Sequence, residues 1–83
     1  MHLSRERWTH IRKKYPEIED SEMLRETIVK HDKITQVHAD QTIHYFWRYC
    51  KNRLSEDKFL LVVVKYLNGE GYILSAYYED KIK

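Results

Sequence analysis

The chain has 83 residues, a formal net charge of +2 and a single cysteine, Cys50. This length predicts one domain, 1–83, with a small hydrophobic core. One cysteine excludes an intramolecular disulfide and fits a reducing, cytoplasmic location. No stretch approaches the ~20 consecutive apolar residues that cross a bilayer, so no membrane partner is expected.

Charge is unevenly distributed along the first third of the chain. Residues 1–14 carry five basic side chains against Glu6 alone, and residues 17–26 carry five acidic side chains against Arg25 alone. The basic end is a candidate surface for an anionic ligand. The alternative is two solvated helix faces of opposite sign, which are common on small domains.

Two helices are predicted before residue 32. Ser4 can cap a helix over Arg5–Lys14, which ends ahead of the chain's single proline because the residue before proline avoids the helical conformation. A second helix is expected to start at Asp20 or Ser21, either of which can cap it, and to fade near residue 31.

Four strands are predicted in the rest of the chain, where the hydrophobic period changes from 3.6 to 2. Asn68-Gly69 indicates a tight hairpin between the last two, because both residues tolerate positive φ. Helices followed by strands predict an α+β fold, with two N-terminal helices packed on a four-stranded antiparallel sheet. The expected strands are Ile34–Ala39, Thr42–Lys51, Phe59–Leu67 and Tyr72–Tyr78.

Lys65 is unusual because it follows a run of valines, and an unpaired buried lysine is costly. A two-residue turn at Asn68-Gly69 places Lys65 opposite Tyr72 and turns it away from Ser75. A three-residue turn with a bulge places Lys65, Ser75 and Tyr77 on one face of the sheet. The sequence leaves both arrangements open.

Histidines give one weak metal-site candidate. His38 and His44 can face each other across the first hairpin if its loop contains three residues between Ala39 and Ile43, with Asp40 as the nearest carboxylate. Two histidines without a clear third ligand make a poor site. We therefore expect neither a metal nor a cofactor.

The remaining polar side chains are those that metal-free RNA cleavage uses. Histidines exchange protons near neutral pH, arginines and lysines stabilise phosphate charge, and tyrosines stack on bases or donate hydrogen bonds. The alternative is an ordinary surface histidine, with tyrosines that only cover a sheet. Trp8 is expected to be a core residue. The candidate set is Arg7, His10, Tyr45, Arg48, Tyr49, Lys65, Ser75, Tyr77 and Lys81.

Taken in order, several short motifs resemble one group of proteins, the small phage- and plasmid-associated nuclease-like members of the barnase–EndoU–colicin–RelE superfamily. The resemblance covers roughly residues 6 to 82. The motifs are Arg7-Trp8-x-His10-Ile11, Tyr15-Pro16-Glu17, Glu26-Thr27-Ile28, Tyr45 with Arg48-Tyr49, Leu61-Val62-Val63-Val64-Lys65 and Ile73-Leu74-Ser75-Ala76-Tyr77.

The resemblance implies helices packed on a four-stranded antiparallel sheet and cleavage of RNA without metal. It also implies a toxin that acts on tRNA or mRNA and is held by an antitoxin. Carried over by position, His10, Arg48, Ser75 and Tyr77 are the expected catalytic residues. The expected substrate-binding residues are Arg7, Lys65, Tyr45, Tyr49 and Lys81.

One position departs from the family pattern. Where these proteins usually have a second histidine before the proline, this chain has Tyr15. The motifs taken together make a metal-independent endoribonuclease the leading hypothesis, with His10 as the general acid or base. The alternatives are a non-catalytic RNA-binding module and a protein–protein interaction module that docks through the acidic second helix or an exposed sheet edge.

Overall fold

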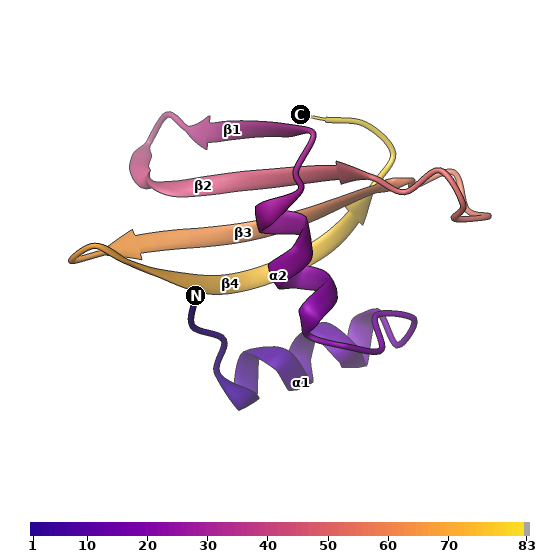
Figure 1. Cartoon of the computed structure of the whole chain (residues 1–83), viewed down its shortest axis with the longest axis horizontal. Coiled ribbons are helices and arrows are strands. Elements are labelled where there is room, and N and C mark those ends of the chain that lie inside the picture. The colour runs from indigo at the N-terminus through magenta and orange to yellow at the C-terminus, as the bar shows by residue number, and fades with distance from the viewer. Residues whose placement is uncertain (83) are drawn as a thin grey trace.

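The chain forms two helices followed by a four-stranded antiparallel sheet, which confirms the predicted α+β class (Figure 1). A computed structural model describes residues 1–82. No helix within these residues is long and apolar enough to cross a membrane. The elements are α1 (Arg5–Lys14), α2 (Glu22–Val29), β1 (Lys33–Val37), β2 (Asp40–Tyr49), β3 (Phe59–Leu67) and β4 (Glu70–Glu79).

The strands lie in sequence order, β1-β2-β3-β4, so β1 and β4 are the two edges. In Figure 1, α2 crosses one face of the sheet, while α1 runs along the outer side of β4. His2 adds a short parallel bridge to that edge, because its backbone bonds Gly71 and Ile73. The β4 edge is therefore covered, whereas no strand of residues 1–82 pairs with the outer side of β1.

The first helix forms as its sequence predicts. The Ser4 hydroxyl accepts a hydrogen bond from the Arg7 amide at 3.1 Å, and the helix ends at Lys14, just before Tyr15-Pro16. Ile11 is its buried residue, and Trp8 is half-buried against the core, as expected. Because Ile11 is the residue that α1 buries, the polar side chains of the neighbouring turns can point away from the core.

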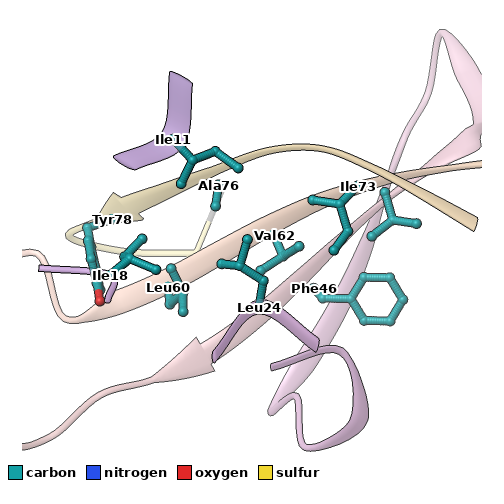
Figure 2. Packing of buried hydrophobic residues seen from close by; sticks show 10 residues of the cluster. Ile11, Ile18, Leu24, Phe46, Leu60, Val62, Ile73, Ala76 and Tyr78 are labelled. Atoms are coloured by element: carbon teal, nitrogen blue, oxygen red, sulfur yellow. The ribbon is translucent and has the colours of Figure 1, made fainter. Parts of the chain in front are cut away.

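One hydrophobic core fills the space between the helices and the sheet (Figure 2). Ile11, Ile18 and Leu24 from the helical half pack on alternate residues of the strands. We call this side of the sheet the helix face and the other side the opposite face. The strand residues of this core are Phe46, Leu60, Val62, Val64, Ile73, Ala76 and Tyr78.

The opposite face also buries large side chains. Trp47 pairs with Leu61, and both are buried although they point away from the helices. The Trp47 indole donates a hydrogen bond to the Thr35 hydroxyl at 2.9 Å. Since Phe46 and Trp47 are adjacent and both buried, β2 is apolar on both sides.

The last hairpin combines the two arrangements left open by the sequence. Asn68 and Gly69 have φ values of 53° and 79°, and they form a two-residue turn that places Lys65 opposite Tyr72. The expectation that this turn separates Lys65 from Ser75 is wrong. The register shifts between Val63 and Val64, which leaves Leu74 as an extra residue in β4. This bulge returns Ser75 to the face of Lys65.

The first hairpin differs from the prediction. Its turn is His38-Ala39, so β1 and β2 both lie slightly nearer the N-terminus than expected. His44 pairs with Gln36 and bonds it through Nε2 at 2.8 Å. The suggested pairing of His38 with His44 is therefore wrong.

Candidate functional site

A pocket of about 460 Å³ lies between α1 and the outer edge of β4. Its helical wall carries Arg7, His10, Lys13 and Lys14, and its strand wall carries Leu74, Ser75, Ala76 and Tyr77 above buried Ile11. We call it the α1–β4 pocket. It brings together four of the nine predicted site residues, which are Arg7, His10, Ser75 and Tyr77.

Helical spacing explains the helical wall. Arg7, His10 and Lys14 follow one another at three and four residues, so they project from the same side of α1. Lys13 also lies three residues after His10. Arg7 is held against the strand because its Nη1 donates a hydrogen bond to the Leu74 carbonyl at 3.0 Å.

The bulge in β4 explains the strand wall. Ser75 and Tyr77 pair with Val63 and Leu61, which places both hydroxyl-bearing side chains on the opposite face, beside Leu74. The Lys14 ammonium lies 5.1 Å from the centre of the Tyr77 ring, at cation–π distance. This contact ties the end of α1 to the end of β4.

Every charged residue that lines the α1–β4 pocket is a cation or a histidine. Within residues 1–82, no ion pair involves Arg7, Lys13 or Lys14. These three cations create a positive potential at the pocket, and two hydroxyls offer hydrogen bonds. An anion with several oxygen atoms, such as a phosphodiester, matches this arrangement.

The predicted grouping of Arg48 with His10 is not found. Arg48 pairs with Leu60, so it lies on the helix face, where its Nη1 is 3.3 Å from a carboxylate oxygen of Glu26. It lines a different pocket, of about 480 Å³, between α2 and the end of β2. We call this the α2–β2 pocket. The alternation of β2 places Arg48 on the side of Phe46, away from Ser75 and Tyr77.

The other predicted residues do not line the α1–β4 pocket. Tyr45 packs edge-on against Trp47, and Tyr49 is 48% exposed beside Phe59, both on the opposite face. Lys65 lies on the same face, with its Nζ 3.4 Å from a carboxylate oxygen of Asp40. Lys81 is exposed after the end of β4.

Tyr15, at the position of the family's second histidine, belongs to the core region. It is half-buried, and its ring meets Tyr78 edge-on at 5.5 Å between centroids. Tyr15 does not line the α1–β4 pocket. Among residues 1–82, His10 is therefore the only histidine that lines the pocket, and no carboxylate lines it. Glu6 lies next to Arg7 and His10 in an adjoining hollow.

Sequence reasoning missed Lys13 and Lys14 as site residues. Both were visible as part of the basic N-terminal stretch, but only their charge was considered. Their spacing of three and four residues from His10 was the signal that could have placed them beside it.

The acidic stretch is largely neutralised within the fold. Glu17 pairs with Arg53 at 3.2 Å, Glu22 with Arg25 at 3.0 Å, and Glu26 with both Arg48 and Lys30. Hydrogen bonding from Arg48, followed by the charge of Lys30, holds the pKa of Glu26 below its ordinary value of 4.5. These carboxylates act mainly on their own chain, which leaves less charge for a partner.

No group of three or more histidine, cysteine, aspartate or glutamate side chains within residues 1–82 is arranged to hold a metal ion. Comparison with known proteins finds no matching family model, curated relative or solved structure. The resemblance to the nuclease superfamily therefore stays a hypothesis.

Proposed function

We propose that the protein is a metal-independent endoribonuclease that binds an RNA phosphodiester in the α1–β4 pocket. The observation that carries the proposal is the composition of that pocket: within residues 1–82, its lining has three cations in no ion pair, two hydroxyls and one histidine, and no carboxylate. RNA carries its own nucleophile, the 2′-hydroxyl, so a site that supplies protons and positive charge is sufficient for cleavage.

In this proposal, the 2′-oxygen attacks the adjacent phosphorus, and the bond from phosphorus to the 5′-oxygen breaks. The products are a 2′,3′-cyclic phosphate and a 5′-hydroxyl. The 2′-hydroxyl loses a proton and the 5′-oxygen gains one, so His10 performs one transfer and water the other. Arg7, Lys13 and Lys14 stabilise the negative charge, while Ser75 and Tyr77 orient the phosphate.

Arg48 has no part in this mechanism, because it lies on the helix face with Glu26. Action as a toxin on tRNA or mRNA, and inhibition by an antitoxin, extend the proposal on the strength of the sequence resemblance alone.

A second candidate is a non-catalytic RNA-binding module. The pocket has a single histidine, and Tyr15 packs against the core instead of supplying a second proton-transfer group. The same cations that favour cleavage would then serve binding only. This alternative predicts RNA binding that weakens steeply with salt and leaves the RNA intact.

The test is incubation of purified protein with single-stranded RNA, with and without EDTA, followed by analysis of the fragments. We expect cleavage that survives EDTA and leaves 2′,3′-cyclic phosphate ends. His10→Ala should reduce the rate at least ~100-fold, the lower range for general acid–base catalysis. His38→Ala, in the exposed β1–β2 turn, is the matched control and should retain activity.

Equal cleavage by the wild type and His10→Ala would remove the assigned role of His10. Binding without any cleavage would favour the second candidate instead.

A further inference from the structure

A second hollow, of about 400 Å³, adjoins the α1–β4 pocket. It is lined by Arg7, Lys65, Leu67, Tyr72 and Leu74, and we call it the Lys65–Tyr72 pocket. Arg7 and Leu74 line both pockets, and the hydrogen bond between them forms the boundary. The two pockets therefore follow one another along β4.

The lining of the Lys65–Tyr72 pocket combines a flat aromatic ring, aliphatic surface and positive charge. Leu67 is 46% exposed and, with Leu74, supplies the aliphatic surface. The Tyr72 ring is fixed on two sides. It stacks on His2 with 4.8 Å between centroids, and its hydroxyl donates a hydrogen bond to Glu70 at 2.9 Å. A held ring beside aliphatic groups suits a nucleobase, and the cations suit its phosphate.

We infer that the Lys65–Tyr72 pocket is a nucleotide subsite for single-stranded RNA, next to the phosphate held in the α1–β4 pocket. The inference rests on the proposed function and deepens it by naming the strandedness of the substrate. Tyr72 and Tyr77 pair with Lys65 and Leu61, which are four residues apart on β3, so the two tyrosines lie roughly 13 Å apart at the usual strand rise. This span exceeds one nucleotide. A base can reach the pocket only when it is unstacked and unpaired, so a single strand fits and a duplex does not.

Asp40 competes with RNA for Lys65. Its carboxylate lies 3.4 Å from the Lys65 ammonium, and hydrogen bonds from the Thr42 hydroxyl and amide keep its pKa below the ordinary value of 3.8. Asp40→Asn removes the competing charge while an amide oxygen can still accept from Thr42. We therefore expect tighter binding in this variant, by about twofold to fivefold.

The test measures anisotropy of a fluorescein-labelled, 2′-O-methyl RNA of ten nucleotides, which cannot be cleaved, and of the corresponding dinucleotide. The longer RNA should bind more tightly than the dinucleotide. Tyr72→Ala should weaken binding of the longer RNA about tenfold by removing a stacking platform, and Lys65→Met should weaken it severalfold. Neither variant should change binding of the dinucleotide.

Two variants guard against loss of structure. Leu67→Ser alters an exposed residue of the Lys65–Tyr72 pocket. It should weaken binding of the longer RNA without affecting the fold. Lys33→Met changes a lysine on β1, at the other edge of the sheet, and is the charge-matched control that should bind normally. Circular dichroism and thermal unfolding of each variant confirm that the fold is intact.

The outcomes separate the subsite from the proposed function. The subsite is wrong if the longer RNA binds no more tightly than the dinucleotide and if substitutions of Tyr72, Lys65 and Leu67 leave its affinity unchanged. The proposal of cleavage in the α1–β4 pocket would then still stand. Tighter binding of a duplex of the same sequence also overturns the single-strand assignment. Failure to bind either RNA at low salt overturns the subsite and the proposed function together.

Discussion

The α1–β4 pocket and the α2–β2 pocket differ in how their cations are partnered. Both arginines of the α2–β2 pocket are paired: Arg48 meets Glu26, and Arg53 meets both Glu17 and Asp57, at 3.2–3.4 Å. Its lysine, Lys51, forms no ion pair within residues 1–82. In the α1–β4 pocket, Arg7, Lys13 and Lys14 form no ion pair within residues 1–82. Basic residues are thus used in two ways on one small domain. Paired cations hold loops and helices to the sheet, whereas unpaired cations remain available to a ligand.

Arg53 shows the structural use most clearly. Its guanidinium lies 3.5 Å from the centre of the Tyr78 ring, and its side chain is 19% exposed. Burial opposes its charge, but the hydrogen bond that Arg53 donates to Glu17 and the charge of Asp57 outweigh that effect and raise the pKa of Arg53. These contacts join the 50–58 loop, the segment after α1 and the end of β4.

The largest predicted effect on stability follows from this cluster. Arg53→Met should lower the free energy of unfolding by about 2 kcal/mol, because Glu17 and Asp57 lose charged hydrogen bonds while the aromatic contact is weakened. Urea unfolding measures the change. Arg5→Met, an exposed arginine in the first turn of α1, is the control. Equal stability of the two variants would contradict the distinction between the pockets.

An intermediate effect is predicted for an unpaired cation. Lys14→Met should weaken RNA binding roughly fivefold and reduce the slope of log affinity against log salt by about one, the contribution of a single phosphate contact. Its stability should stay close to that of the wild type. Lys51→Met, in the α2–β2 pocket, is the matched control and should leave affinity and salt slope unchanged. If Lys51→Met weakens RNA binding more than Lys14→Met does, the RNA binds in the α2–β2 pocket, which contradicts the proposed binding site.

The smallest predicted effect is the pH dependence of the stability that Glu26 contributes. The pKa of Glu26 is lowered in the folded state, so its ion pairs contribute stability above pH 4.5, and this contribution disappears as the pH falls through the lowered value. Glu26→Gln should therefore lose stability near pH 7 and little near pH 3. Urea unfolding at both pH values tests the sign. A larger loss at pH 3 than at pH 7 would show that the ion pairs of Glu26 do not stabilise the fold.

Parts of the fold could be predicted because local signals agreed. The bounds of α1 follow from Ser4 and Pro16, and those of β3 follow from a β-branched run between a polar loop and Asn68-Gly69. The His10–Arg7 side of the α1–β4 pocket was predictable for the same reason. Helical spacing alone fixes which side chains of α1 share a surface.

The other wall of the site was harder to predict for two physical reasons. The bulge at Leu74 has no glycine or proline to mark it, yet it decides the face of Ser75 and Tyr77. The face of Arg48 was hidden because Phe46 and Trp47 are both buried, on opposite sides, so β2 shows no alternation of apolar and polar residues. Tertiary packing on both faces of the sheet removed the period that would have oriented Arg48.

The central claim is that RNA binds along α1 and β4, in the α1–β4 pocket and the adjoining Lys65–Tyr72 pocket. The most direct test is an NMR titration of the ¹⁵N-labelled protein with a 2′-O-methyl RNA of ten nucleotides, followed through the backbone amides. The account predicts that the largest shift changes cluster in residues 7–14 and 72–77, on the walls of the α1–β4 and Lys65–Tyr72 pockets. Shift changes that cluster instead in residues 48–53, around the α2–β2 pocket, would contradict it.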